Sequence, residues 1–201
     1  ALRGIGRADS VTLDPHKGLF LPYGTGALLV RDGEALRALH SSTAGYLPPN
    51  QDEFYDPAQY GPELSRGFPG LRVWLTLKLF GAEKYRAAVA EKRALAVWAA
   101  GQVAAIPGIV IDAAPQLSLF AFHMEGPGLE TRAAQDAATK ALMERVTQRG
   151  RIMMTGATAE GRFVGRICVL SFRTRRAEME LAVQQLREEA AAILAGACTA
   201  S

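Results

Sequence analysis

The sequence has few of the residues that mark disulfide scaffolds, metal centres or membrane spans. It contains only two cysteines, Cys168 and Cys198, among 201 residues, and their spacing matches no metal-ligand pattern. Two such thiols are typical of a reducing compartment, so we expect a cytoplasmic protein without a metal site. No apolar run approaches the roughly 18 residues that a membrane helix requires. The first residues do not form a signal peptide, and we expect no membrane association.

A strong excess of charge of one sign is also missing. The chain carries 23 basic and 20 acidic residues, which gives a net charge of +3. These charges are interspersed, whereas a nucleic-acid interface requires basic residues gathered on one face. The fractions of 49% hydrophobic and 21% charged residues are those of an ordinary globular protein. We therefore expect no nucleic-acid partner.

The apolar pattern predicts strands and helices that alternate along the chain. Up to residue 105 it predicts strands at 10–14 and 26–30, loops at 16–24 and 41–66, and helices at 32–39, 71–80 (buried) and 83–105. Beyond residue 108 it predicts strands at 109–112, 117–124, 151–155 and 163–172, and helices at 129–149 and around 179–193. This second part is typical of a small α+β lobe with helices on one face of an antiparallel or mixed sheet.

The chemically distinctive residues are concentrated in the run Asp14-Pro15-His16-Lys17-Gly18. Lys17 follows the end of a predicted strand, where side chains point into the crevice at the carboxyl edge of an α/β sheet. Partial burial there lowers the pKa of an ammonium, and a neutral amine forms a Schiff base with an aldehyde. The alternative is a loop lysine that extends its ammonium into water.

The surroundings of Lys17 favour the first interpretation. The runs ADSVTLDPHK at residues 8–17 and YGTGALLV at residues 23–30 resemble the lysine region of group II pyridoxal-phosphate-dependent amino-acid decarboxylases. That family includes the aromatic-amino-acid, histidine and glutamate decarboxylases. The resemblance implies pyridoxal 5'-phosphate as cofactor, Lys17 as its Schiff-base lysine, and His16 and Asp14 as neighbours of its phosphate.

A tyrosine in the predicted loop 41–66 extends the resemblance. Tyr46 lies 29 residues after Lys17 and precedes Leu47, and this spacing is similar to that of the catalytic loop tyrosine in the aromatic-amino-acid and histidine decarboxylases. The resemblance implies that Tyr46 is the general acid that protonates Cα after carbon dioxide leaves, in a loop that excludes water. Tyr55 and Tyr60 lie in the same predicted loop and are the alternatives. A loop tyrosine can also be a surface packing residue.

Two later runs resemble other parts of the same family. Residues 65–74 resemble the segment that opens its C-terminal domain, and residues 163–171 resemble its terminal strand. In the glutamate decarboxylases the arginine of that strand is associated with a substrate carboxylate, so the resemblance implies substrate binding by Arg166. An arginine in an otherwise apolar strand requires an anionic partner, and that partner is either the substrate or a nearby acidic side chain.

The resemblance implies a fold class and a domain division. The class is α/β, similar to the fold-type-I pyridoxal-phosphate-dependent transferases. Residues 1–66, with the active-site loop 41–66, would form the C-terminal end of the large α/β domain. Residues 67–201 would form a small C-terminal α+β domain.

The resemblance also implies an activity and an assembly. It implies decarboxylation of an L-amino acid to the amine and carbon dioxide, in a homodimer with its active site at the subunit interface. In that family the aspartate that pairs with the pyridinium nitrogen precedes the lysine, so we expect a C-terminal portion that is inactive alone. Two alternatives stay open: another fold-type-I carbon–carbon lyase, and a non-catalytic dimerisation fragment.

Overall fold

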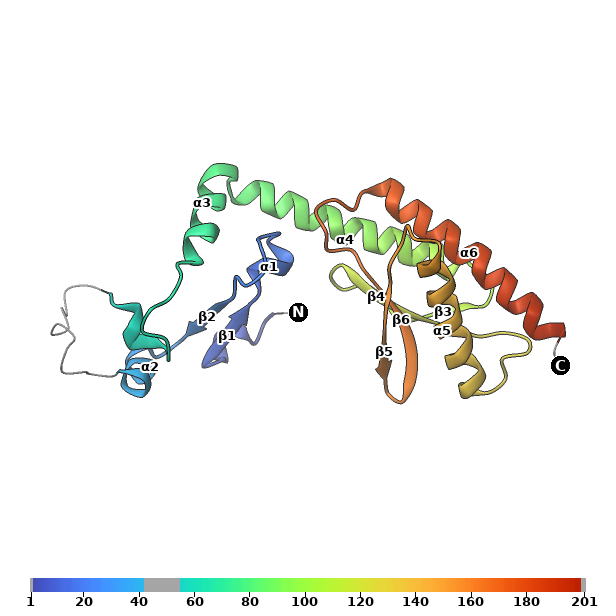
Figure 1. The fold of residues 1–201 in the computed structure, drawn as a ribbon, viewed down its shortest axis with the longest axis horizontal. Coiled ribbons are helices and arrows are strands. Elements are labelled where there is room, and N and C mark those ends of the chain that lie inside the picture. Colours follow the sequence, from blue (N-terminus) through green and yellow to red (C-terminus); the bar gives the residue numbers. More distant parts are fainter. Residues whose placement is uncertain (1, 42–54, 200–201) are drawn as a thin grey trace. The chain divides into compact units, whose positions relative to one another are not determined.

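The computed structural model describes residues 2–41 and 55–199, which fall into two compact units (Figure 1). The first unit is Ala1–Ala82 and the second is Glu83–Ser201. Among the helices within those described ranges, none combines the length and the apolarity needed to cross a membrane. The expected domain boundary at residues 66 and 67 falls earlier than this division, and the domain assignment stays a prediction.

The first unit contains short elements around a two-stranded sheet. In chain order they are η1 (Ile5–Arg7), β1 (Ser10–Leu13), α1 (Pro15–Gly18), β2 (Ala27–Val30), α2 (Gly33–His40), η2 (Pro57–Tyr60) and α3 (Gly70–Phe80). Strands β1 and β2 are antiparallel, with Ser10 opposite Val30 and Leu13 opposite Ala27. The sequence predicts both strands correctly, but it places a loop where α1 forms. Pro15 begins this helix, because its fixed φ and missing N–H suit the first helical position.

Helix α2 begins where the sequence predicts. The Asp32 side chain accepts a hydrogen bond of 3.0 Å from the Ala35 backbone N–H, and it thereby satisfies one of the unpaired donors at the helix start. Glu34 lies in the first turn, where its negative charge is favourable near the positive end of the helix dipole.

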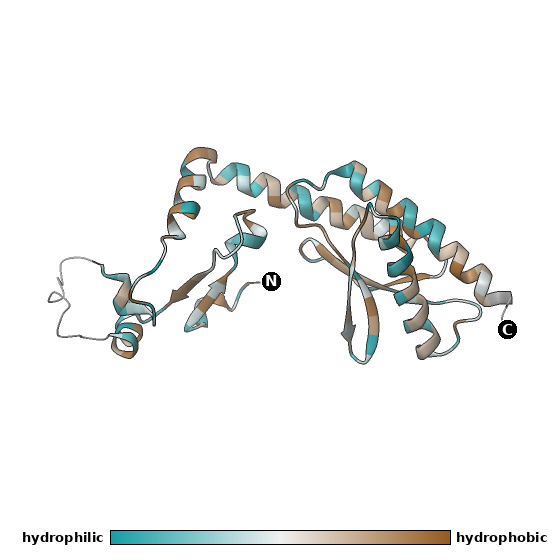
Figure 2. Ribbon diagram, viewed as in Figure 1, coloured by the Kyte–Doolittle hydropathy of each residue, from teal (hydrophilic) through white to brown (hydrophobic). Residues whose placement is uncertain are grey.

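Helix α3 corrects one expectation. The sequence predicts a buried helix, but no residue of α3 is buried in the structure. Much of the α3 ribbon is brown, the colour of hydrophobic residues, in Figure 2, and the side chains of Trp74, Leu79 and Phe80 are all more than half exposed. The apolar run therefore forms a helix as predicted, but the described residues do not cover it.

The second unit is a four-stranded antiparallel sheet packed against three helices. Its elements are α4 (Ala82–Ala104), β3 (Ile109–Ala113), β4 (Leu119–Met124), α5 (Arg132–Gln148), β5 (Thr155–Ala159), β6 (Arg162–Cys168) and α6 (Arg176–Thr199). The strand order is β3-β4-β6-β5. This arrangement is the α+β lobe that the sequence predicts.

All three helices pack on the same face of this sheet (Figure 1). Alternate residues of β4, including Phe120 and Phe122, point into the core and are fully buried. Gly165 of β6 lies opposite Phe122, and a Cβ at this glycine would meet the Phe122 ring at 2.6 Å. The close contact explains why a residue without a side chain is needed there.

The position of β5 is a second correction. The sequence predicts a strand at 151–155, whereas β5 runs from Thr155 to Ala159 and pairs with β6. A two-residue turn joins them: Glu160 and Gly161 both have positive φ, at 49° and 73°. Such turns match the twist of paired strands. Ile152 and Met154 are partly buried against the core, which accounts for the apolar alternation that suggested a strand.

Candidate active site

Helix α1 brings three of the predicted site residues together. Lys17 Nζ lies 2.6 Å from Asp14 Oδ2 and donates a hydrogen bond to it. Asp14 precedes the helix but does not cap it with its side chain, because the carboxylate is directed to Lys17 instead. His16 lies between them in the sequence and is partly buried. Asp14 and Lys17 therefore form an ion pair at the carboxyl end of β1, and His16 lies on the same short helix as Lys17.

The imidazole of His16 is held by the chain that leads into β2. Its Nδ1 lies 2.9 Å from the carbonyl oxygen of Thr25, and the His16 backbone N–H donates to the same oxygen at 3.3 Å. A carbonyl only accepts, so Nδ1 carries a proton and Nε2 faces away from this contact. Thr25 is itself buried and donates its hydroxyl to Pro22. The His16 and Tyr23 rings make a T-shaped contact, with their centroids 5.2 Å apart.

The state of Lys17 differs from the expectation of a partly buried amine. Its side chain is 60% exposed, and the hydrogen bond to Asp14 raises the pKa of Lys17 above its usual value. The same hydrogen bond lowers the pKa of Asp14. Within the described residues Lys17 is thus a stabilised ammonium, and its conversion to a neutral amine requires separation from Asp14.

Tyr46 lies outside the described residues, so its predicted role stays a prediction. The chain on either side of residues 42–54 is described. Ser41 Oγ donates a hydrogen bond of 2.7 Å to Gln59 Oε1, which joins the end of α2 to η2. The alternative tyrosines, Tyr55 and Tyr60, stack on each other with ring centroids 4.9 Å apart.

Arg166 belongs to the second unit, in the middle of β6. It lies opposite Ala121 of β4 and Thr155 of β5, and it is partly buried. Arg166 lines a cavity of about 360 Å³ together with Arg151, Cys168 and Thr174. The described residues give its guanidinium no hydrogen bond and no ion pair. Glu178 lines the same cavity but makes no ion pair with Arg166, so substrate binding by Arg166 stays a prediction.

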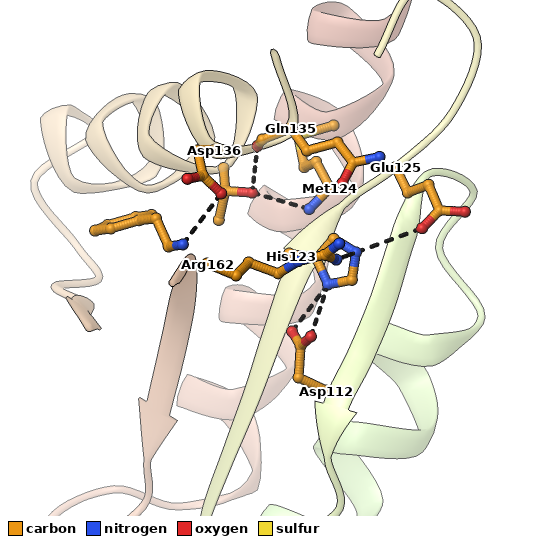
Figure 3. Close-up of polar contacts among 9 residues, drawn as sticks. Asp112, His123, Met124, Glu125, Gln135, Asp136 and Arg162 are labelled. Atoms are coloured by element: carbon orange, nitrogen blue, oxygen red, sulfur yellow. Dashed lines mark hydrogen bonds and ion pairs between the residues drawn. The ribbon is translucent and has the colours of Figure 1, made fainter. Parts of the chain in front are cut away.

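Sequence reasoning missed a buried polar cluster on the face of the sheet opposite the helices (Figure 3). His123 is 3% exposed, and its Nδ1 donates to both carboxylate oxygens of Asp112 at 2.9 Å. Its Nε2 contacts the guanidinium of Arg162 and lies 3.5 Å from Glu125. A carboxylate behind a histidine is typical of a general base, but here Arg162 occupies the nitrogen that would take the proton. We therefore assign this cluster a structural role.

Sequence reasoning also missed Lys92 on α4. The side chain is 2% exposed, the most buried charged group in the second unit as described. One signal was present in the sequence: Lys92 precedes Leu95 and Ala99 by three and seven residues, so it occupies the apolar stripe of the helix. Within the described ranges, no group of three or more histidine, cysteine or acidic side chains is placed to hold a metal ion.

Comparison with protein families connects the Lys17 region to a known chemistry. A family model described as the pyridoxal-dependent decarboxylase conserved domain matches residues 1–125. The match includes Asp14, His16 and Lys17. It covers more than half of the chain and extends through β4.

Two curated proteins of similar sequence are named as decarboxylases of amino acids. The aromatic-L-amino-acid decarboxylase of Bacillus atrophaeus is 32% identical over 185 residues, which are 89% of this chain and 38% of that protein. Human histidine decarboxylase is 26% identical over 199 residues, which are 98% of this chain and 29% of that protein. The chain thus spans well under half the length of both relatives.

A solved structure shows the same fold. The crystal structure of Oryza sativa TDC with PLP and tryptamine matches with a TM-score of 0.90 at 22% identity, over 96% of this chain and 41% of that one. The predicted fold class, α/β of the fold-type-I kind, is confirmed by this match.

Proposed function

Because the chain belongs to the pyridoxal-dependent decarboxylase family, we propose that it is part of an enzyme that converts an L-amino acid to its amine and carbon dioxide. The observation that carries this proposal is helix α1, which follows β1 and carries both the primary amine of Lys17 and the imidazole of His16. When bound, pyridoxal phosphate withdraws electrons from the Cα of the substrate and so permits loss of carbon dioxide.

The residues on α1 suit such a cofactor. Lys17 offers an exposed primary amine that can hold an aldehyde carbon through Nζ. His16 has its Nδ1 fixed by Thr25, so Nε2 is the nitrogen available to a phosphate oxygen. Asp14 keeps Lys17 in its ammonium form through a hydrogen bond of 2.6 Å, so Lys17 must separate from Asp14 before its amine can bind an aldehyde. We assign cofactor binding to these three side chains.

Two further residues would act on the substrate. We assign Arg166 to the substrate carboxylate, because this partly buried residue lines a cavity and makes no ion pair among the described residues. We assign Tyr46 to the protonation of Cα, because a phenol can act as a general acid once carbon dioxide has left. The assembly we propose is a cytoplasmic homodimer with its active site at the subunit interface.

The first experiment identifies the lysine. The intact protein is loaded with pyridoxal phosphate, reduced with borohydride and digested, and the labelled peptide is identified by mass spectrometry. We expect the label on Lys17, and a label on another lysine would remove the basis of the assignment. Substrate is then found by measuring carbon dioxide and amine from a panel of aromatic, basic and acidic L-amino acids.

The second experiment concerns Tyr46. In the intact enzyme Tyr46→Phe keeps the ring and removes the hydroxyl, and we expect amine formation to fall at least about a hundredfold. Tyr55→Phe is the matched control, because Tyr55 stacks on Tyr60 in the same part of the chain. Unchanged amine formation by Tyr46→Phe would overturn this role.

A further inference from the structure

Lys92 places an ammonium group on the apolar face of α4. Leu95, Ala96 and Ala99, which follow it at helical spacing, are all buried. Removing an ammonium from water is costly, and a methionine would fill a similar volume without that cost. The contacts that the ammonium makes must therefore offset the cost of burying Lys92.

Those bonds connect α4 to the segment between β6 and α6. Lys92 Nζ donates a hydrogen bond of 2.6 Å to the carbonyl oxygen of Thr174, and it lies 3.6 Å from Glu91 Oε1. A hydrogen bond from Arg175 lowers the pKa of Glu91, so the carboxylate remains ionised beside the ammonium. Lys92 thus holds one backbone atom of a loop that lies 82 residues further along the chain.

A second, weaker link accompanies this one. The guanidinium of Arg175 lies 2.7 and 2.8 Å from the two carboxylate oxygens of Glu91, but its side chain is largely exposed. Exposed ion pairs contribute little because water and salt screen them. The buried bond from Lys92 therefore does more than the Arg175 pair to define where Thr174 lies.

Thr174 forms part of the wall of the cavity of about 360 Å³ that Arg166 and Cys168 also line. We propose that Lys92 is a positioning residue that fixes the Thr174 side of this cavity and thereby sets how well the cavity binds its ligand. Lys92 acts through Thr174 and does not itself line the cavity. The kinetic part of this inference rests on the proposed substrate contact of Arg166, whereas the shape of the cavity can be tested without it.

The test compares variants of the intact, cofactor-loaded protein. Lys92→Met removes the ammonium at nearly constant volume, Lys92→Arg keeps a donor, and Lys84→Met is the control at the exposed start of the same helix. Two properties are measured: the rate at which iodoacetamide alkylates Cys168, followed on its peptide by mass spectrometry, and the KM and kcat for the amino acid that the wild type decarboxylates.

We expect Lys92→Met to speed alkylation of Cys168 about fivefold and to raise KM about tenfold, with kcat within about twofold of wild type. In Lys92→Arg the alkylation rate and KM should both lie within about threefold of the wild-type values, because a guanidinium also donates to a carbonyl. Lys84→Met should change neither value. If Lys92→Met matches Lys84→Met in both measurements, or if Lys92→Arg is as impaired as Lys92→Met, the positioning role is wrong.

Two additions keep the result interpretable. If Lys92→Met does not fold, Lys92→Gln replaces it, because its shorter uncharged side chain also removes the ammonium that donates to Thr174, and an unchanged Cys168 rate in that variant would overturn the proposal. Arg166→Met separates this inference from the proposed function. If Arg166→Met leaves KM unchanged while Lys92→Met still speeds alkylation, the substrate role of Arg166 fails and the positioning role of Lys92 stands.

Discussion

The two units of this chain bury their apolar residues to very different extents. In the second unit a continuous core runs from α4 through β4, β6 and α5 to α6, with Phe120, Phe122 and Leu186 fully buried. In the first unit, Leu21 is the one large apolar side chain that is buried among the described residues. Leu28, Leu29 and Trp74 are each more than half exposed there. The second unit can stabilise itself, and the first depends on surfaces outside it.

The same difference applies to two lysines. Lys92 in the second unit is buried and donates to a carbonyl that its own unit supplies. Lys17 in the first unit is exposed and pairs with Asp14 only three residues away. A buried ammonium requires a complete set of neighbours, whereas an exposed pair needs only local chain geometry. The residue proposed for catalysis therefore lies in the unit with the less complete surroundings.

The largest expected effect comes from separating the units. Residues 83–201 expressed alone should unfold cooperatively in urea, because their core is complete. Before unfolding they should show the near-ultraviolet circular dichroism of ordered aromatic side chains. Residues 1–82 expressed alone should show no cooperative transition, because they bury too little apolar surface. Circular dichroism and hydrogen exchange measure the unfolding of each fragment. A cooperative transition in residues 1–82 would contradict the comparison.

A single core substitution should have the next largest effect. Phe122→Ala in residues 83–201 should lower the free energy of unfolding by about 3–5 kcal/mol, because it leaves a cavity between β4 and the helices. Val110→Ala on the edge strand β3 is the control, since Val110 is 40% exposed, and it should cost less than about 1 kcal/mol. Urea denaturation followed by fluorescence gives both values, and equal losses would show that the core is not where the structure places it.

The sequence alone does not predict most of the difference in burial between the two units. Periodicity and capping residues predict α2, α4 and α5 well, because these signals are local, and the α5 helix ends before Gly150 with a φ of 73° as expected. Burial of α3 was predicted wrongly, since apolar composition shows that a helix requires cover but not whether its own unit supplies it. The shift of β5 has a local cause, the Glu160-Gly161 turn, which sets where β5 ends and β6 begins.

The site shows the same limit. The motif around Lys17 identifies the amine and the imidazole from adjacent residues, and the family comparison agrees with it. The bond from Lys92 to Thr174 spans 82 residues, and the His123–Asp112 pair depends on the register of β3 and β4. Contacts of this kind follow from tertiary packing, so no local pattern predicts them.

The smallest expected effect concerns the Lys17–Asp14 pair. Since the hydrogen bond to Asp14 raises the pKa of Lys17, the amine is less often neutral at a given pH than a lone lysine would be. Asp14→Asn removes the negative charge and the hydrogen bond of the carboxylate, so the pKa of Lys17 should fall and its neutral fraction at pH 8 should rise. The rate of Lys17 reductive methylation between pH 7 and 10, measured by mass spectrometry, reports this fraction.

Asp9→Asn is the matched control for that change, because Asp9 is an exposed carboxylate of the same unit that makes no ion pair with Lys17 in the described structure. The Asp9 variant should leave the pH profile of Lys17 in place. If Asp14→Asn also leaves it in place, the pair does not persist in the intact protein, and the surfaces that complete the first unit must then separate Lys17 from Asp14. If the profile moves to lower pH as expected, the pair persists in the intact protein, and the amine must leave Asp14 before it can bind an aldehyde. The presence or absence of this shift therefore tells whether the first unit keeps its local geometry once its surroundings are complete.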